Sequence, residues 1–364
     1  MKKCALILCE KKMSPKSQKS LSSCEIVFKP MREILLTSVK KADVNDVFLL
    51  TQNEERTEKL RNFILQNEKG DMFIAEGTSP FIAPETIVNS YQNFLKNDRK
   101  ITAVVSDFCD SFSALWLTVS DLKKHCSFAD DEVISLDNIV KVFDDINEFT
   151  SHNADDFLNA KNLSDVMKFN EYKRRKILEK LMLSGVEIPC ADGVIISEDA
   201  SIEADVKIHP STIIMEKNKI SRGAEIGPFV RIRPGCIIGE NARIGNFVEL
   251  KKASVGKGTK ISHLSYIGDS FVGGNVNIGC GCATVNFDGT NKNKTVIEDG
   301  AFIGCGVNLV APVTVGKDAY VAAGSTVTEN VPEKALAIAR SRQVNKNGWV
   351  EKKKPYKRMK KNGR

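Results

Sequence analysis

The sequence predicts an α/β domain over residues 1–163, followed by an all-β parallel β-helix of hexapeptide repeats over residues 189–331. Three observations lead to this prediction. Strand-like apolar runs alternate with charged, helix-like runs in the first part, and an aliphatic residue recurs at every sixth position in the second. Between them, apolar residues have the spacing of a helix. We expect residues 164–188 to form a linker helix and residues 332–364 to form a C-terminal tail with a basic end.

The first domain is predicted from three short apolar runs, ALIL, DVFLL and ITAVVS, which are separated by charged segments. This alternation is typical of a small α/β domain. The helix that follows is predicted over residues 164–184, where Val166, Phe169 and Ile177 are among the apolar residues with helical spacing. We expect Gly185 to end this helix, because glycine commonly follows the last helical residue.

The hexapeptide repeat is the strongest feature of the second part. A period of six is neither the 3.6 of a helix nor the alternation of an isolated strand. It indicates a solenoid with three short strands per coil, in which each aliphatic residue points inward and packs on the coils above and below. The aliphatic positions are 202, 208, 214, 220, 226, 232, 238, 244 and 250, then 255, 261, 267, 272 and 278, and finally 297, 303, 309, 315, 321 and 327.

This series of aliphatic positions, here called the ladder, is interrupted between Ile278 and Ile297. The sequence there reads GCGCATVNFDGTNKNKTV. The insertion is polar, and it is either a plain surface loop or a functional one. Long loops in compact repeat proteins are often functional.

Coil stacking places one histidine beside this insertion. One coil is three steps of the ladder, so Asn246, His263 and Cys280 should stack on the outer surface. His263 then lies one coil before the loop, and it is either a proton-transfer group or a surface histidine without a role. Several basic residues nearby suit a phosphate ligand, although charge is also normal on a solenoid surface. They are Arg231, Arg233, Lys251 and Lys252.

Charge and composition argue against several classes of function. The net charge is +7, and residues 351–364 (EKKKPYKRMKKNGR) alone hold eight Lys/Arg and one Glu, so the rest of the chain is neutral. A short basic tail is usually solvated, and we do not expect nucleic-acid binding. No apolar run near the start is long enough to cross a membrane, so we expect a cytoplasmic protein with reduced cysteines. The ten cysteines form no CxxC pair, and we expect no metal site.

Several segments closely resemble one family. They are GPFVRIRPG (227–235), IGNFVELKKASVGKGTKISHLSYIGD (244–269) and VNIGCGCATVNFDGTNKNKTVI (276–297), with LVAPVTVG and VAAGSTVT beyond them. The family is the bifunctional bacterial enzyme glucosamine-1-phosphate N-acetyltransferase/N-acetylglucosamine-1-phosphate uridylyltransferase, and the resemblance covers about residues 190–350.

The resemblance implies a left-handed β-helix and a homotrimer with its acetyltransfer site between neighbouring solenoids. It also implies acetyl transfer from acetyl-CoA to the amine of glucosamine 1-phosphate. The product, N-acetylglucosamine 1-phosphate, would serve the biosynthesis of UDP-GlcNAc and the cell envelope.

The resemblance further assigns roles to single residues. It implies that His263, in the HLxY motif, is the general base, since an ammonium group must lose a proton before it can attack a thioester. The residues implied to contact the sugar phosphate are Arg233, Lys251, Tyr266, Asn277 and Lys292, the last across a subunit boundary. The residues implied to line acetyl-CoA are Cys280, Asn286, Phe287, Cys305, Ala323 and Arg340.

The acetyltransferase motifs depart from the family at a few positions. The usual G-A-G-T reads Gly279-Cys280-Gly281-Cys282, and Cys305 replaces a customary serine. Passage of the acetyl group through a cysteine thiolate therefore stays open beside direct transfer, which we favour.

The N-terminal half departs much further. The glycine-rich phosphate loop of the family reads LILCEKKMSPKSQKS here, without its glycines and arginine. Thr78 stands where a metal-binding aspartate is expected, and threonine cannot supply a carboxylate to Mg²⁺. The segment NAKNLSDV stands where an asparagine ligand would lie. We predict a degenerate nucleotidyltransferase-like domain without uridylyltransferase activity, so that Mg²⁺ would be needed only if that half were active.

Two other functions remain open. One is the full bifunctional enzyme, which would also form UDP-GlcNAc from UTP. The other is a non-catalytic trimeric scaffold, although the motif residues around His263 argue against it. A γ-class carbonic anhydrase on the same solenoid would need three histidine ligands, and only His209 and His263 lie in the ladder.

Overall fold

The structure is a computed structural model that describes residues 2–52, 55–108, 112–125 and 134–353. Cys109, Cys126 and the basic end of the tail from residue 354 onward lie outside these described residues. The chain divides into two compact units. The first contains Met1–Leu181 with Ile195–Glu198, and the second contains Met182–Val194 with Asp199–Arg364.

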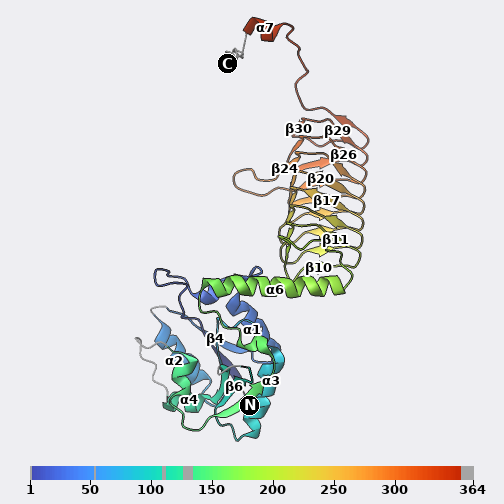
Figure 1. The fold of residues 1–364 in the computed structure, drawn as a ribbon. Helices are drawn as coiled ribbons and strands as arrows, with labels where there is room; N and C mark the ends of the chain where they lie inside the picture. Colours follow the sequence, from blue (N-terminus) through green and yellow to red (C-terminus); the bar gives the residue numbers. More distant parts are fainter. Residues whose placement is uncertain (1, 53–54, 109–111, 126–133, 354–364) are drawn as a thin grey trace, which may run out of the picture. The chain divides into compact units, whose positions relative to one another are not determined.

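The first unit (Figure 1) is built on a six-stranded sheet, whose strand order is β4-β1-β5-β7-β6-β8. β1 is parallel to β4 and β5, β7 is antiparallel to β5 and β6, and β8 is parallel to β6. The runs ALIL, DVFLL and ITAVVS form β1, β4 and β6, which confirms the predicted α/β domain. The strands are β1 (Lys3–Leu8), β4 (Asp46–Leu50), β5 (Asp71–Glu76), β6 (Thr102–Ser106), β7 (Phe112–Thr118) and β8 (Asn147–Ser151).

Helices cover both faces of this sheet because successive side chains of each strand point to opposite sides. Ile7 of β1 packs with Val39 and Phe94 of α1 (Met31–Lys41) and α3 (Pro84–Lys96). Its neighbour Leu6 packs on the other face with Leu60 of α2 and with residues of α4 and α5. The bounds are α2 (Arg56–Gln66), α4 (Val119–His125), α5 (Leu136–Val140), η1 (Leu21–Ser23), η2 (Ala154–Phe157), β2 (Glu25–Ile26) and β3 (Lys29–Pro30).

The helix predicted over residues 164–184 is present as α6 (Leu163–Leu183). Gly185 follows it with φ of 91°, a left-handed conformation that glycine adopts without strain. The first unit also includes β9 (Ile195–Ile196).

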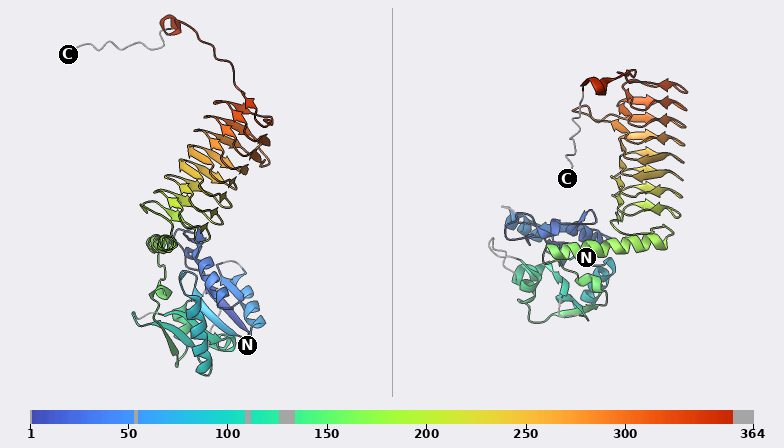
Figure 2. Two further views of the ribbon diagram at one scale, coloured as in Figure 1. Left: turned by 90° about the vertical axis from the view of Figure 1, so that its right-hand side faces the viewer. Right: turned by 45° about the horizontal axis from the view of Figure 1, so that its top comes forward.

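The second unit is the predicted solenoid, a left-handed parallel β-helix whose coils stack one on another (Figure 2). Three parallel sheets form its sides, here called faces 1, 2 and 3. Face 1 contains β10 (Ser201–Ile202), β13 (Lys219–Ile220), β16 (Ile237–Ile238), β19 (Ser254–Val255), β22 (Ser270–Val272), β25 (Thr295–Ile297) and β28 (Val313–Val315). Face 2 contains β11 (Lys207–Ile208), β14 (Glu225–Ile226), β17 (Arg243–Asn246), β20 (Lys260–His263), β23 (Asn277–Ile278), β26 (Phe302–Ile303), β29 (Tyr320–Val321) and β31 (Leu336–Ala337). Face 3 contains β12 (Ile213–Ile214), β15 (Arg231–Ile232), β18 (Glu249–Lys251), β21 (Tyr266–Gly268), β24 (Ala283–Val285), β27 (Asn308–Val310) and β30 (Thr326–Val327).

The aliphatic ladder forms the core of the solenoid. On face 2, Ile226, Ile244 and Ile261 pair in register and are completely buried. Burial of each such side chain stabilises the fold by about 1.5–3 kcal/mol. Truncation to alanine would cost about 2–5 kcal/mol because it also leaves a cavity between coils.

The solenoid differs from the predicted ladder in two places. Thr284 holds the inward position in β24, so the interruption contains one regular strand. Its hydroxyl accepts a hydrogen bond from the Gly268 backbone N–H at 2.8 Å, which satisfies a polar atom in the core. Pairing also continues beyond residue 331, because β31 (Leu336–Ala337) stacks on β29. The period of six does not mark this strand, since Leu336 is exposed. A short helix, α7 (Trp349–Lys353), follows in the tail.

Candidate active site

Two cationic residues of the candidate site stack at the same edge of face 3. Ile232 of β15 pairs with Leu250 of β18, so the residues that follow them, Arg233 and Lys251, occupy the same place in consecutive coils. Lys251 in turn pairs with Gly268 of β21. Neighbouring parallel strands are about 4.8 Å apart. The repeat thus brings together two cations that lie a full coil apart in the sequence.

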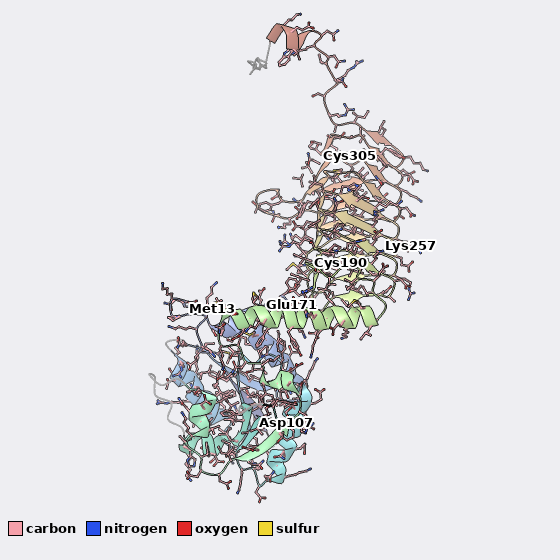
Figure 3. All side chains as sticks on the ribbon, in the orientation of Figure 1. Met13, Asp107, Glu171, Cys190, Lys257 and Cys305 are labelled. Carbon is pink, nitrogen blue, oxygen red and sulfur yellow. The ribbon has the colours of Figure 1, made fainter. Side chains whose placement is uncertain are left out.

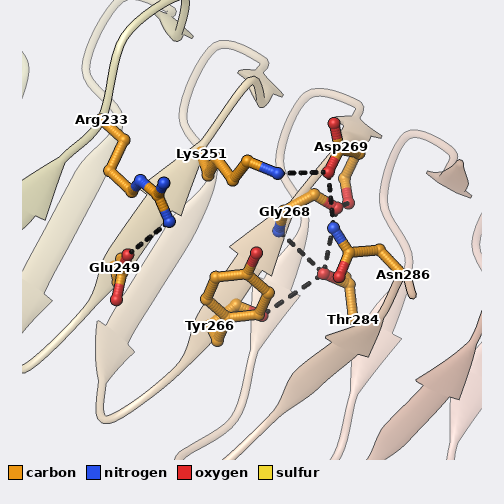
Figure 4. Close-up of polar contacts among 9 residues, drawn as sticks. Arg233, Glu249, Lys251, Tyr266, Gly268, Asp269, Thr284 and Asn286 are labelled. Carbon is orange, nitrogen blue, oxygen red and sulfur yellow. Dashed lines mark hydrogen bonds and ion pairs between the residues drawn. The ribbon is translucent and has the colours of Figure 1, made fainter. Parts of the chain in front are cut away.

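Asp269 connects this edge to the loop (Figure 4). Its Oδ2 accepts hydrogen bonds from Lys251 Nζ at 3.1 Å and from Asn286 Nδ2 at 2.5 Å. Lys251 and Asn286 are 8% and 6% exposed, so the three groups form a nearly buried polar network. Although burial opposes it, the hydrogen bonds from Lys251 and Asn286 and the charge of Lys251 hold the pKa of Asp269 below its ordinary value.

Arg233 is less tightly held than Lys251. Its guanidinium makes one contact of 3.4 Å with Glu249 Oε1, and both side chains are about two-fifths exposed. A guanidinium has five N–H donors in a planar fork that matches a phosphate. Arg233 therefore keeps donors directed to solvent for an anionic ligand.

The loop between β24 and β25 projects from the solenoid (Figure 1). Phe287 and Lys292 pair across its base in an antiparallel bridge, and Lys292 Nζ lies 5.8 Å from the centroid of the Phe287 ring. Asp288 closes the tip by accepting hydrogen bonds from the backbone N–H groups of Thr290 at 2.8 Å and Asn291 at 2.7 Å. The insertion is thus a small ordered hairpin.

Lys292 lies close to cations of its own chain. The ammonium of Lys251 beside it lowers the pKa of Lys292. A cavity of about 330 Å³ opens next to the loop, and its lining includes Lys252, Lys292 and Lys294 together with Asp269. A reach of Lys292 across a subunit boundary stays a prediction, and within one chain it faces the cluster around Lys251.

Tyr266 lies over the backbone of Gly268 on the outer surface of face 3 (Figure 4). A Cβ on Gly268 would lie 2.4 Å from the Tyr266 hydroxyl oxygen and 2.7 Å from Cζ. Any side chain at position 268 would displace the tyrosine. Glycine is therefore needed here for close approach and not for its backbone angles.

His263 ends β20 on face 2, at the corner that leads to face 3. Its Nδ1 lies 2.8 Å from Asn246 Oδ1 in the preceding coil, and the predicted pairing of Asn246 with His263 is confirmed. An amide oxygen only accepts hydrogen bonds, so Nδ1 carries the proton. In the neutral ring the lone pair is then on Nε2, which is free to accept a proton.

The same corner carries the residues implied to line acetyl-CoA. Ile261, Ile278, Ile303 and Val321 pair in turn along face 2, so the residues two positions later share one column. That column contains His263, Cys280, Cys305 and Ala323 in consecutive coils. The Arg340 side chain lies at its far end, with Cδ 3.6 Å from the place of a Cβ on Gly324.

The residue type at this corner changes in the coils after His263. Three bulky residues with positive φ occupy the next position of the early coils, namely Phe229, Phe247 and Leu264. Glycines with φ between 66° and 76° replace them in the later coils, namely Gly281, Gly306 and Gly324. The later coils therefore carry no side chain at this position of the corner.

Asn277 does not lie at the edge of face 3 that carries Arg233 and Lys251. It begins β23 on face 2, where it pairs with Lys260 and Phe302 in the neighbouring coils. Within one chain it lies on a different face from Arg233, Lys251 and Asn286.

Sequence reasoning assigned no role to three residues of the site, although it placed one of them, Asn246, beside His263. Asp269 anchors both Lys251 and Asn286, Glu249 contacts Arg233, and Asn246 holds the histidine. Only Asn246 had a signal, since the ladder already placed it in the His263 column.

In the first unit, the residues that depart from the family motifs contact other residues of the same unit. Thr78 Oγ1 donates to Asn159 Oδ1 at 2.8 Å and to Glu76 Oε2 at 3.3 Å, and Asn159 Nδ2 also donates to Glu76. In the segment LILCEKKMSPKSQKS, Glu10 is buried in an ion pair with Arg56. Among the described residues, no group of three or more His, Cys, Asp or Glu side chains could hold a metal ion.

The repeat and the fold define the second unit as a hexapeptide-repeat solenoid. The family described as bacterial transferase hexapeptide (six repeats) matches residues 219–252 and 294–329. The described helices include none that is long and apolar enough to cross a membrane.

The chain is a homologue of the bifunctional proteins called GlmU. It is 46% identical to that of Geobacillus sp. (strain WCH70) over 212 residues, which is 49% of this chain and 46% of the relative. It is 38% identical to that of Brevibacillus brevis over 281 residues, 67% of this chain and 60% of the relative. With the GlmU of Exiguobacterium sibiricum, identity reaches 62% over 133 residues, 36% of this chain and 30% of the relative. The chain thus spans about half the length of most of the curated relatives it matches.

Proposed function

We propose that the solenoid transfers the acetyl group of acetyl-CoA to the amine of glucosamine 1-phosphate. The observation that carries this proposal is the His263–Asn246 contact, which leaves Nε2 as the proton acceptor at the corner between faces 2 and 3. The homology to bifunctional GlmU proteins over the same segment supports it.

The reaction needs a base, an anion site and a thioester in one place. His263 Nε2 takes a proton from the sugar ammonium, and the free amine attacks the thioester carbonyl. As the tetrahedral intermediate collapses to the amide, the attacking nitrogen loses its second proton to solvent, and the CoA thiolate leaves and takes the proton held by His263. A backbone N–H along the corner stabilises the oxyanion in between.

Arg233 and Lys251 hold the phosphate at the edge of face 3, with Tyr266 and Lys292 beside the sugar. Fixing both substrates in this way converts a bimolecular step into an effectively intramolecular one. Because Asn277 lies on another face of its own chain, it meets this sugar from a neighbouring solenoid, which is consistent with a homotrimer. We place the enzyme in the cytoplasm, where its product enters UDP-GlcNAc synthesis.

The exposed thiols do not act as acetyl carriers in this proposal. In this proposal His263 activates the amine for direct attack on acetyl-CoA, so the reaction needs no acetyl-cysteine intermediate. Cys282 is also unsuited to one, because it is buried, and burial raises the pKa of its thiol.

The first unit has no uridylyltransferase activity in this proposal. Glu76, Thr78 and Asn159 hydrogen-bond one another, and Thr78 supplies no charge for Mg²⁺. Incubation of the full chain with UTP, Mg²⁺ and N-acetylglucosamine 1-phosphate should give no UDP-GlcNAc and no pyrophosphate. Formation of either at a rate near that of acetyl transfer would show that both activities are present.

Acetyl transfer itself is tested with a panel of amino sugars. Release of the CoA thiol from acetyl-CoA should be fast with glucosamine 1-phosphate and slow with glucosamine and glucosamine 6-phosphate, which lack the anomeric phosphate. In Arg233→Ala, the rate with glucosamine 1-phosphate should fall toward the rates with the other two sugars, because the variant lacks a phosphate contact. Equal rates with all three sugars, or no thiol release at all, would contradict the proposal.

A further inference from the structure

Two exposed cysteines occupy the same position in consecutive coils. Ile278 pairs with Ile303, so the residues two positions later, Cys280 and Cys305, are neighbours along the corner. The Gly306 N–H donates to the Cys280 carbonyl at 2.7 Å, which fixes the two backbones side by side. Both cysteines are free thiols and exposed in the described chain.

Their spacing is within the range of a disulfide. A Cβ on Gly279, next to Cys280, would lie only 2.9 Å from Cys305 Cα. Stacked parallel strands are about 4.8 Å apart, and disulfides join residues whose Cα atoms are about 4.4–6.8 Å apart. Both cysteines lie in turns outside the strands, and their carbonyls accept inter-coil hydrogen bonds from the N–H groups of Gly306 and Gly324 at 2.7 and 2.8 Å. A bridge therefore requires side-chain rotation and a small backbone shift.

The third thiol of the group is not equivalent. Cys282 is 4% exposed, and its Sγ contacts the Gly304 carbonyl oxygen at 3.0 Å in the interior. Burial raises the pKa of this thiol, and the nearby Cys305 and Cys280 raise it further. Cys282 is therefore protected, while the two corner thiols are accessible to small reagents.

We propose that Cys280 and Cys305 form a vicinal dithiol that low-molecular-weight disulfides oxidise reversibly to an intrachain disulfide between two coils. One thiolate attacks the small disulfide, and its S–S bond breaks to release one thiolate. The second cysteine then attacks the mixed disulfide and releases the other. The protein loses two electrons and two protons, and the small disulfide is reduced to two thiols.

The position of the pair next to His263 favours this chemistry. His263 holds the same place one coil earlier, so its imidazole is near the Cys280 thiol and can accept its proton. An exposed bridge whose closure shifts the backbone has a higher reduction potential than a buried structural disulfide. It will open again under reducing conditions, as a regulatory bond must.

Closure of the bridge should also stop acetyl transfer, a consequence that rests on the proposed function. The disulfide lies along the corner proposed for acetyl-CoA and pulls on the coil above His263. A shift of about 1 Å near reacting groups can cost about a hundredfold in rate, so we expect at least a tenfold loss of acetyl transfer.

Peptide mapping tests the dithiol without reference to activity. The full chain is equilibrated with mixtures of reduced and oxidised glutathione, alkylated and digested with trypsin. Cleavage after Lys292 and Lys294 puts Cys280 and Cys305 on separate peptides. A linked peptide should appear as the mixture becomes oxidising and disappear on reduction. An equal mixture of isotope-labelled and unlabelled chains shows whether the bond lies within one chain.

Two variants sharpen this test. Cys305→Ser should abolish the linked peptide, whereas Cys190→Ser should not, because Cys190 lies near the other end of the solenoid (Figure 3). No linked peptide at the most oxidising ratio, a bond between two chains, or a bond from Cys280 to Cys282 would overturn the proposal.

Activity is measured on the same samples. Oxidised protein should lose acetyl transfer and regain it on reduction, and the rate of the Cys280→Ser/Cys305→Ser double variant should not depend on the glutathione ratio, because it keeps neither corner thiol. A linked peptide in a protein that never transfers acetyl groups would refute the proposed function and leave the dithiol standing. A linked peptide with unchanged acetyl transfer would refute the regulatory role.

Discussion

Asn246 Oδ1 accepts a hydrogen bond from His263 Nδ1 at 2.8 Å, across two consecutive coils of the solenoid. This contact fixes both the ring orientation and the nitrogen that carries the proton. Asn246 touches no reacting atom in the proposed mechanism, so it is a positioning residue. Its removal should affect the chemical step and leave sugar binding nearly intact.

Asn246→Ala is therefore expected to lower kcat by about ten- to a hundredfold, with little change in KM for glucosamine 1-phosphate. Asn246→Asp gives a more specific readout. A carboxylate stabilises the imidazolium, so the acidic limb of the kcat/KM profile should move to higher pH. Steady-state kinetics between pH 5 and 9 would check both variants. An Asp variant with an unshifted limb would show that Asn246 does not act through His263.

Asp269→Asn should destabilise the solenoid by about 1.5–3 kcal/mol, because hydrogen bonds to a nearly buried charged group are lost. Glu240→Gln is the matched control, since it breaks an exposed pair with Lys257 and should change the stability far less. Urea unfolding at pH 7 measures both changes. Equal effects of the two substitutions would mean that the Lys251–Asp269–Asn286 network adds no stability.

The Asp269 contribution also has a defined pH dependence. The pKa of Asp269 is lowered in the fold, so its stabilisation is fully present above the unfolded value of about 3.9. It is lost as the pH falls through the lower folded pKa. The stability gap between wild type and Asp269→Asn should be constant from pH 8 to pH 5 and shrink below about pH 4. A gap that instead grows on acidification would contradict this assignment.

Gly268→Ala should lower kcat/KM for the sugar phosphate by about ten- to a hundredfold, because the new Cβ pushes Tyr266 from its place. The three atoms nearest that Cβ all belong to Tyr266, which makes the effect testable by a double-mutant cycle. In a Tyr266→Ala background the alanine at 268 should cost almost nothing. Additive losses in the double variant would show that Gly268 acts through the backbone.

Lys292 gives a prediction at alkaline pH. The neighbouring Lys251 ammonium lowers its pKa below the ordinary 10.5, so Lys292 loses its charge earlier than a free lysine as the pH rises. The kcat/KM for glucosamine 1-phosphate should therefore decline on the alkaline side, and Lys292→Arg should flatten that decline because arginine stays charged. Lys294→Arg serves as the control at the same loop. An unchanged alkaline limb in Lys292→Arg would rule out Lys292 as a phosphate contact.

Much of the fold was predictable because it follows from periodicity. The steps of six fix which residues point inward, and three steps fix which residues stack, so the Asn246–His263 pairing followed from counting alone. Thr284 and β31 were missed because the six-residue period was traced through aliphatic residues alone. A threonine whose hydroxyl is satisfied by backbone groups can hold an inward place equally well.

The site was less predictable than the ladder. Arg233 and Lys251 were identified from their motifs, but nothing in the sequence shows that Asp269 Oδ2 joins Lys251 to Asn286. That contact depends on how the loop folds back after β24, which periodicity does not specify. The same limit applies to the corner, whose change from Phe247 and Leu264 to glycine becomes meaningful only once the coils are stacked.

The measurement that tests the central claim most directly is the release of CoA thiol from acetyl-CoA in the presence of glucosamine 1-phosphate, compared between wild type and His263→Ala. The account predicts rapid release by the wild type and a loss of about a hundred- to ten-thousandfold in the variant, the range for removal of a general base. No release by the wild type, or an equal rate in His263→Ala, would contradict it.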